Sequence, residues 1–232
     1  MAKDALGSGR RLAAEVRPRF ESVNQPSPLT HDLKGNPNVQ ISTQPTALDW
    51  DRWYEEGRNT RIVTEIESQN FRTRVGAAEG MTVLDVACGT GGWTRQLARW
   101  GMNVTGLDFS AFAIGAARRG GSANGLIRYE QHDVDAAGSP DWMEPGSVDI
   151  VSVRCGIAFL DRPLFLRVAG RLLRPSTGAL YVMTLISEDE QQHAHMRGLS
   201  ENEVAELGYG WASCAAYSLG PYRCVVLRGP AN

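Results

Sequence analysis

Short apolar runs alternate with stretches of helical periodicity through most of the chain. The apolar runs, several of which end in an acid, predict strands, and the periodic stretches predict helices that can pack on a sheet. This alternation favours one α/β domain. We expect strands at residues 81–86, 102–108, 125–134, 147–153 and 179–184, and helices at residues 60–74, 93–100 and 164–173.

The two ends of the chain depart from this alternation. Residues 211–218 and 222–227 predict two strands, and Gly220-Pro221 between them predicts a hairpin turn. At the other end, residues 1–47 mix charges and prolines without sustained periodicity, so we expect a mobile N-terminal extension. The predicted domain then comprises residues 48–232, with cap helices at residues 48–76.

A loop of small residues follows the first predicted strand and is the most informative stretch of the sequence. Glycines at alternate positions let the backbone adopt conformations that a side chain forbids, so a ligand such as an adenosine-type cofactor can lie against bare peptide. Asp85 at the strand tip would repel the pyrophosphate of a dinucleotide, which otherwise binds at a helix N-terminus. The same carboxylate suits an ammonium group and a sulfonium. The loop residues are Ala87, Cys88, Gly89, Thr90 and Gly91.

The run from Asp85 to Gly91 resembles the first motif of class I S-adenosylmethionine-dependent methyltransferases, an acid-x-Gly-x-Gly-x-Gly pattern. Ala87 replaces the first glycine, which we expect to be tolerated if its backbone angles are ordinary. The resemblance covers about residues 60–228 and is strongest to compact small-molecule and tellurite-resistance-type enzymes. It implies a Rossmann-like seven-stranded, mostly parallel sheet with one antiparallel strand, in a three-layer α/β/α arrangement.

Acids at the ends of the next two predicted strands support the resemblance. Asp108 lies about 17 residues beyond the last loop glycine, an offset at which a carboxylate can accept both hydroxyls of a ribose. The resemblance implies that Phe109 lies near the adenine and that Asp133 binds the adenine amino group. It also implies that the amide of Val134 meets a ring nitrogen and that the loop wraps the methionine part of the cofactor. His132 alternates with Asp133, so we expect it to point the other way.

The end of the fourth predicted strand should face the transferable methyl. Enzymes that methylate amino groups of nucleic-acid bases usually have an Asn/Asp-Pro-Pro-aromatic motif at this position. Residues 154–157 do not match this motif. Metal-dependent catechol-type enzymes carry a carboxylate here, whereas Arg154 has the opposite charge, so a metal-independent enzyme is favoured. We interpret Arg154 as a contact for an acidic substrate group or for the cofactor carboxylate, with a backbone-only contact as the alternative.

Candidate acceptor residues flank this position. Trp53, Tyr54 and Phe159 are interpreted as walls of an acceptor pocket, and an aromatic face can attract the sulfonium through a cation–π interaction. His193 and His195 titrate in the range useful for a general base. The competing interpretation is that two histidines in a polar segment are surface residues. The segment has no recognised metal-ligand spacing, so no metal is expected.

Composition and charge restrict the partners. The chain has 232 residues, 42% of them hydrophobic, a formal net charge of -2 and a pI near 6.1, so it has no general attraction for nucleic acid or an anionic membrane. No apolar stretch approaches the roughly 20 residues that cross a bilayer, and no signal-peptide core is visible. We therefore expect a cytoplasmic monomer or homodimer whose cysteines are reduced thiols.

The sequence thus predicts a methyltransferase that acts on a small molecule. Methyl transfer is an in-line displacement that requires alignment of the nucleophile with the methyl group and exclusion of water. S-adenosylmethionine would be converted to S-adenosylhomocysteine. Two alternatives stay open: an NAD(P)-dependent oxidoreductase, and a protein of the same fold that binds the cofactor without transferring methyl. The sequence does not specify whether oxygen, nitrogen, sulfur or carbon accepts the methyl.

Overall fold

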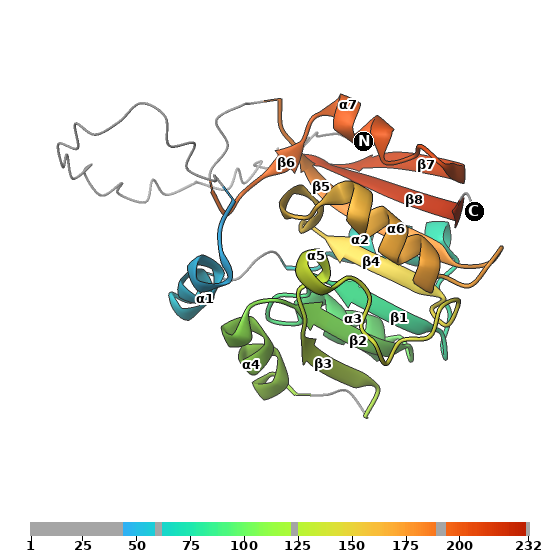
Figure 1. Cartoon of the computed structure of the whole chain (residues 1–232). Coiled ribbons are helices and arrows are strands. Elements are labelled where there is room, and N and C mark those ends of the chain that lie inside the picture. The colour runs from blue at the N-terminus through green and yellow to red at the C-terminus, as the bar shows by residue number, and fades with distance from the viewer. Residues whose placement is uncertain (1–43, 59–61, 122–124, 189–193, 231–232) are drawn as a thin grey trace, which may run out of the picture. The chain divides into compact units, whose positions relative to one another are not determined.

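The computed structural model describes residues 44–58, 62–121, 125–188 and 194–230. In these residues the strands form one sheet in the order β3-β2-β1-β4-β5-β8-β7, and β6 also pairs with β5 (Figure 1). Neighbours from β3 to β5 are parallel, and β8 is antiparallel to both β5 and β7. The strands are β1 (Thr82–Val86), β2 (Asn103–Asp108), β3 (Ile127–Gln131), β4 (Ile150–Arg154), β5 (Ala179–Ile186), β6 (Gly198–Leu199), β7 (Trp211–Leu219) and β8 (Tyr222–Pro230).

The predicted fold class is confirmed, with two local differences. The C-terminal hairpin forms as expected, and Leu219 pairs with Tyr222 across its turn. The third strand is shorter than predicted, because Asp133 takes a non-strand role as the N-cap of the following helix. The short strand β6 was not predicted, since two residues carry no periodicity of their own.

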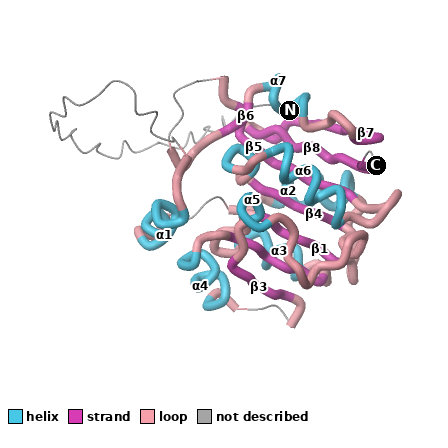
Figure 2. Tube along the Cα trace, viewed as in Figure 1, coloured by secondary structure: helices cyan, strands magenta, loops and turns pink. Residues whose placement is uncertain are grey.

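Helices cover both faces of the sheet (Figures 1 and 2). Most begin at a hydroxyl or carboxylate side chain that accepts a hydrogen bond from a backbone N–H of the first turn, as at Thr46, Ser110 and Asp161. The helices are α1 (Ala47–Glu55), α2 (Glu65–Val75), α3 (Gly92–Arg99), α4 (Ala111–Arg119), α5 (Val134–Ala137), α6 (Arg162–Leu172) and α7 (Glu201–Glu206), with the 3-10 turn η1 (Ile157–Phe159).

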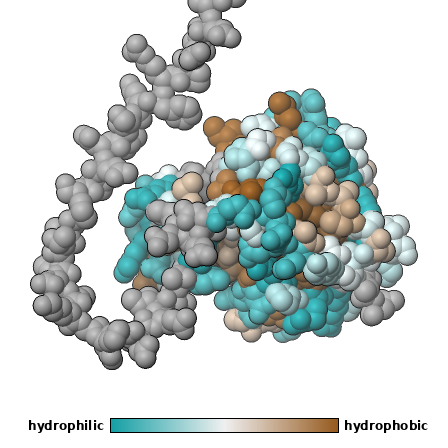
Figure 3. Space-filling view, turned by 90° about the horizontal axis from the view of Figure 1, so that it is seen from above, coloured by the Kyte–Doolittle hydropathy of each residue, from teal (hydrophilic) through white to brown (hydrophobic). Residues whose placement is uncertain are grey.

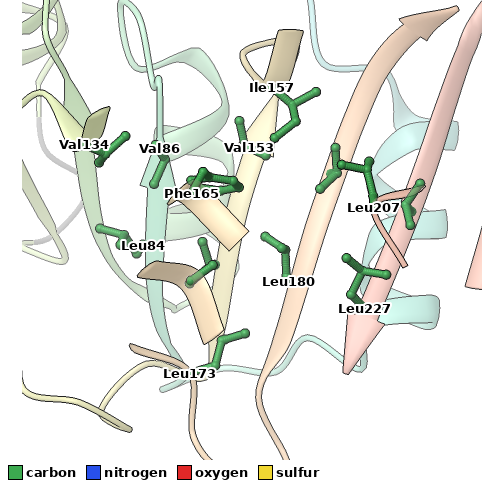
Figure 4. Close-up of a cluster of buried hydrophobic side chains, with 14 of the residues drawn as sticks. Leu84, Val86, Val134, Val153, Ile157, Phe165, Leu173, Leu180, Leu207 and Leu227 are labelled. Atoms are coloured by element: carbon green, nitrogen blue, oxygen red, sulfur yellow. The ribbon is translucent and has the colours of Figure 1, made fainter. Parts of the chain in front are cut away.

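Strand alternation divides the core into two layers. Leu84 faces the α6 side, where it shares a cluster with Phe165 and Leu180 (Figure 4). Its neighbour Val83 faces the opposite side, where it shares a cluster with Phe71. Because these side chains are almost wholly buried, each contributes about 1.5 to 3 kcal/mol of hydrophobic stabilisation. The sheet is therefore held rigidly, and its strand ends are fixed in space.

The outer surface is mixed. Seen from above, hydrophobic residues gather in a few places among hydrophilic ones (Figure 3). Among the described helices, none combines the length and the hydrophobicity that crossing a bilayer requires. Of the predicted N-terminal extension, residues 1–43 lie outside the described residues, residues 44–46 lead into α1, and Ala47 is the first residue of that helix.

Candidate functional site

A cavity of about 240 Å³ lies at the carboxyl ends of the parallel strands, where α1 reaches over them. Ligands of open α/β sheets bind at this edge, because the loops that follow neighbouring strands converge there. A wider groove of about 680 Å³ runs between α6 and α7 but contains none of the predicted site residues. The cavity is lined by Gln44, Pro45, Trp50, Tyr54, Val86, Ala87, Asp108, Phe109, His132, Asp133, Val134, Asp135, Arg154, Cys155, Gly156, Phe159 and Leu160.

The loop after β1 has a left-handed backbone at its first position. Ala87 has φ 55°, so the condition of ordinary backbone angles, under which we expected alanine to be tolerated here, is not met. A non-glycine residue in this region costs about 1 to 2 kcal/mol. Gly156, after β4, makes room for the Ala87 side chain, since a Cβ on Gly156 would lie 2.6 Å from the Ala87 Cβ. Cys155 beside it is also left-handed, at φ 60°, so backbone strain is concentrated on two sides of the cavity.

Asp85 lies beneath the loop and is not a lining residue of the cavity. Its carboxylate accepts hydrogen bonds from the Thr94 hydroxyl at 2.6 Å and the Ser152 hydroxyl at 3.3 Å. Burial raises the pKa of Asp85 to about 7, against the lowering effect of these two hydrogen bonds. Asp85 therefore links β1 to α3 and β4, and its predicted contact with the cofactor stays a prediction.

Asp108 lines the cavity at the end of β2 and is buried. Its Oδ2 accepts the Gly89 N–H at 2.8 Å, and its Oδ1 accepts the Ser110 N–H at 2.9 Å. Burial raises the pKa of Asp108 to about 6. Asp108 thus links the glycine loop to the start of α4 and presents a carboxylate to the cavity.

Helix α1 is held over the cavity by Asp51. The Asp51 Oδ1 accepts the Ser110 hydroxyl at 2.5 Å and the Phe112 N–H at 3.1 Å. A carboxylate at the N-terminus of α4 is favoured by the unpaired N–H groups and the helix dipole there. Ser110 is therefore shared between the cavity residue Asp108 and the covering helix.

The segment after β3 brings four further residues to the cavity, His132 to Asp135. Asp133 Oδ1 accepts the N–H groups of Asp135 and Ala136, at 3.0 and 3.2 Å, and so caps α5. His132 also lines the cavity, which corrects our expectation that it would point away. The alternation of side chains along a strand does not apply to His132 and Asp133, because β3 ends at Gln131. The His132 Nε2 lies 2.8 Å from the Gly138 carbonyl oxygen.

Asp135 is a lining residue that the sequence did not indicate. Its Oδ2 accepts the Asp161 N–H at 3.0 Å, whereas its Oδ1 is buried and has no hydrogen-bond partner among the described residues. Burial raises the pKa of Asp135, and the neighbouring acids Asp133 and Asp161 act in the same direction. The wall at this end of the cavity is therefore acidic.

Arg154 lines the cavity, but its charge already has a partner. Its Nε and Nη2 donate to the two carboxylate oxygens of Glu67, at 2.5 and 3.0 Å. The two side chains are only 8% and 2% exposed, so the pair is a buried bridge between the end of β4 and α2. This geometry favours a structural role over our interpretation of Arg154 as a contact for an acidic group.

Aromatic residues of α1 divide between two positions. Tyr54 lies over the glycine loop, since a Cβ on Gly89 would be 2.9 Å from the Tyr54 hydroxyl oxygen. Burial raises the pKa of Tyr54 well above its ordinary value. Trp50 packs on Phe159 with ring centroids 5.0 Å apart at 87°, and both rings line the cavity. Of the predicted acceptor walls, Tyr54 and Phe159 both line the cavity, and their contact with an acceptor stays a prediction.

Trp53 and His195 lie together but are not among the residues that line the cavity. Their rings stack with centroids 4.6 Å apart at 10°, and the His195 ring also meets Trp50 at 4.9 Å and 84°. The Arg58 guanidinium lies 4.8 Å from the Trp53 ring. His195 thus joins the segment before β6 to α1, and the candidate base His193 lies outside the described residues.

Four of the predicted cofactor-binding residues lie in the glycine loop, outside the cavity lining. The loop lies beneath Tyr54, at the edge of the cavity, and Gly91 at φ 78° is the N-cap of α3. Among the residues that the structure describes, no group of three His, Cys, Asp or Glu is placed to hold a metal ion. The predicted loop residues outside the lining are Cys88, Gly89, Thr90 and Gly91.

Comparisons with known proteins point to one family. The family model described as a methyltransferase domain matches residues 83–176. Ubiquinone biosynthesis O-methyltransferase of Sodalis glossinidius is 29% identical over 154 residues, which cover 65% of this chain and 59% of that protein. The 2-methyl-6-phytyl-1,4-hydroquinone methyltransferase of Synechocystis sp. is 35% identical over 115 residues, which cover 49% of this chain and 35% of that protein.

A solved structure gives the same result for the fold. Phosphoethanolamine N-methyltransferase 2 of Haemonchus contortus, in complex with phosphomonomethylethanolamine and S-adenosylhomocysteine, superposes with a TM-score of 0.62 at 14% identity. The superposition covers 80% of this chain and 58% of that chain. The chain therefore spans less than two thirds of the length of these relatives, and at this identity the structural likeness concerns the fold alone.

Proposed function

We propose that the chain is a class I S-adenosylmethionine-dependent methyltransferase that transfers a methyl group from S-adenosylmethionine to a small molecule, as the methyltransferase-domain match and the methyltransferase relatives support. The observation that carries the proposal is the convergence of three strand ends at one cavity. Ala87 after β1, Asp108 after β2 and Asp133 after β3 all line it. The narrower likeness to tellurite-resistance-type enzymes stays a prediction.

The chemistry of the lining residues suits this donor. The Asp108 carboxylate is an acceptor for ribose hydroxyls, and the Asp133 carboxylate is an acceptor for the adenine amino group. Phe109 and Val134 offer apolar surface to the purine.

Bound S-adenosylmethionine supplies an electrophilic methyl group on a positively charged sulfur. The residues of the chain orient the reactants and exclude water. Trp50 and Tyr54 on α1 cover the cavity, and the Asp51 anchor holds that helix in position. Gly156 presents bare backbone beside Ala87, at the strand end where the acceptor is expected. We propose a metal-independent displacement, because Arg154 stands where metal-dependent relatives would need a carboxylate.

The donor half of the proposal is tested by calorimetry on the full chain. S-adenosylhomocysteine should bind, and NAD⁺ should not bind measurably. Tight binding of NAD⁺ with no binding of S-adenosylhomocysteine would instead favour the oxidoreductase alternative.

The transfer half needs a product. The chain is incubated with S-adenosylmethionine that carries an isotope-labelled methyl group and with a fractionated metabolite extract, and labelled products are identified by mass spectrometry. A labelled small molecule is expected. Binding of the donor without a labelled product from any fraction would favour the alternative of a cofactor-binding protein that transfers no methyl.

The partners follow from the same cavity. Its volume of about 240 Å³ favours a small acceptor over a folded macromolecule. The net charge of -2 gives no support to a nucleic-acid partner. The oligomeric state, monomer or homodimer, stays a prediction that light scattering on the full chain would decide.

A further inference from the structure

The two edges of the sheet are built differently. β3, at one edge, is five residues long and carries the charged side chains of Arg128 and Glu130. The His132 N–H donates to β2, so by alternation the Tyr129 carbonyl points away from β2, toward the open edge. Arg118 occupies this carbonyl, since its Nε and Nη2 donate to it at 3.2 and 2.6 Å. Short length, charge and an occupied carbonyl all hinder the addition of a further strand to β3.

β7, at the opposite edge, has none of these protections (Figure 1). It is nine residues long and contains no charged residue and no proline. One side of β7 pairs with β8, and on its other side no strand of the described residues pairs with it. Among the same residues, no side chain donates to or accepts from the backbone of residues 212–219, and residues 212–216 are exposed. A long uncharged edge with unpaired N–H and C=O groups is a template for another strand.

The charged side chains beside β7 leave this edge open. On β8, Arg223 pairs with Glu201, and Arg228 donates to the carbonyl oxygens of Thr177 and Val75 at 3.2 and 2.6 Å. These cations are therefore held by groups of the same chain, away from the free edge.

The geometry of β7 suits a second copy of the same strand. An antiparallel pair of identical strands has a twofold axis at its centre, so each strand offers the other the same groups. Pairing of all nine residues places Trp211 opposite Leu219 of the second copy and Ala215 opposite itself. In this register odd-numbered residues meet odd-numbered ones, so the N–H and C=O groups that point outward from both strands face each other.

The same register keeps the cation nearest the strand apart from its copy. The exposed Arg74 guanidinium lies 4.3 Å from the centroid of the Tyr217 ring. Tyr217 would lie opposite Ser213 of the second copy, so four residues, or about 14 Å, separate the two Tyr217 positions along the strand direction. Exposed charges at this separation are largely screened by salt.

Surface at the two ends of β7 can extend the contact. A specific interface buries about 1,200 to 2,000 Å² in total, so surface beside the strand must contribute. Tyr209, just before β7, is 77% exposed, and Pro221, just after it, is also exposed. The twofold axis brings the start of one β7 beside the end of the other, and with it Tyr209 toward Pro221 of the second copy. Exposed aromatic residues are enriched in protein interfaces.

We propose that the chain forms a twofold homodimer in which β7 pairs antiparallel with β7 of a second copy, with Ala215 at the axis. The two sheets join into one continuous sheet. Neither the donor nor the acceptor takes part in this contact, so its tests are independent of the proposed function.

Light scattering coupled to gel filtration of the full chain tests the association. The wild type should have the mass of two chains. Ala216→Lys places two like charges about 7 to 8 Å apart across the axis, so the dissociation constant should rise about ten-fold or more. Ala78→Lys, at an exposed alanine in the loop before β1, is the matched control and should stay dimeric. A single-chain mass for the wild type, which would leave the edge to a different protein, or equal dissociation constants for Ala216→Lys and the wild type, would overturn the proposal.

A cross-linking experiment tests the register with substitutions small enough to preserve the fold. Ala215→Cys is made in a Cys214→Ser background, and Cys214→Ser alone is the control. Opposed residues of an antiparallel pair have Cα atoms about 4.5 to 5.5 Å apart, a separation that a disulfide can span. Oxidation with copper phenanthroline should give a reducible covalent dimer of the Ala215→Cys chain and none of the control. No cross-link in the Ala215→Cys chain, or equal cross-linking in both chains, would overturn the pairing at Ala215.

Discussion

The two sides of the cavity are built in different ways. The donor side, made of residues 85–91, 108–110 and 132–135, consists of strand ends whose contacts are largely to backbone N–H groups. The proposed acceptor side, made of α1 and residues 154–160 together with the contacts of Glu67 and His195 outside the lining, consists of aromatic and charged side chains that meet across long sequence separations. Backbone geometry determines the donor side, and side-chain packing determines the acceptor side. Substitutions should therefore affect the two sides differently.

The largest effect is expected where the acceptor side is tied to α2. Glu67→Gln leaves Arg154 charged and buried without its counterion, so the free energy of unfolding should fall by about 3 to 5 kcal/mol. Urea unfolding of the full chain measures this. Glu65→Gln, on an exposed position of the same helix, is the matched control and should change stability by less than about 0.5 kcal/mol. Similar values for the two variants would show that the buried pair is not structural.

On the donor side, Asp85 should make stability depend on pH. The pKa of Asp85 is about 7 in the folded chain, against an ordinary value of 3.8. The folded chain therefore binds this proton more tightly than the unfolded chain does. As a result, the free energy of unfolding falls as the pH rises from 3.8 to about 7. Asp85→Asn removes that dependence. From pH 4 to pH 8 the wild type should lose about 3 kcal/mol more stability than the variant, as measured by urea unfolding. Parallel pH curves would contradict the raised pKa.

Asp108→Ala tests the donor side by binding. Loss of charge-assisted hydrogen bonds to the ribose should weaken S-adenosylhomocysteine by about 1 to 3 kcal/mol, which is roughly 5- to 150-fold in calorimetry. Asp141→Ala, at an exposed acid outside the cavity, serves as the control. Affinity that is unchanged in a folded Asp108→Ala protein would remove the ribose assignment.

The contact between Gly156 and Ala87, which joins the two sides, can be tested by adding one methyl group in Gly156→Ala. Gly156 has φ -105°, which alanine tolerates, so the cost of Gly156→Ala is the clash with Ala87. We expect a loss of about 1 to 2 kcal/mol of stability in urea unfolding. The double variant with Ala87→Gly should recover most of it, because the clashing Cβ is gone and the left-handed position suits glycine. Additive losses would mean that these residues do not touch.

The smallest effect is expected at His195. Its ring stacks on Trp53 and is not among the lining residues, so His195→Ala should lower stability by about 0.5 to 1.5 kcal/mol and leave turnover at saturating acceptor nearly unchanged. His193→Ala is the companion variant for the base hypothesis. Loss of turnover in His195→Ala, with its KM preserved, would restore His195 as the base.

The sequence was sufficient for most of the fold and for the placement of part of the donor side. Strands and the glycine loop have local signals, which is why Ala87, Asp108, Phe109, Asp133 and Val134 were found before the structure and all line the cavity. Their roles toward a bound cofactor stay predictions. The left-handed angle of Ala87 was missed, since alanine itself gives no indication of a positive φ.

The acceptor side could not be predicted in the same way. The partner of Arg154 is 87 residues away in the sequence, and nothing near either residue indicates the other. Trp53 was expected to line the cavity but stacks on His195, whereas Trp50, one turn away, lines it. Which ring of a helix faces a cavity depends on how that helix docks, here through Asp51 on α4, and this is a tertiary property.

The place of β8 in the sheet has a consequence for biosynthesis. β8 lies between β5 and β7, so β7 reaches the rest of the sheet only through a strand that the ribosome makes after it. Until residues 222–230 have left the exit tunnel, β5 keeps an open, apolar edge and the nascent chain has a strand without a partner. Conditions that delay the pairing of β8 would therefore favour aggregation.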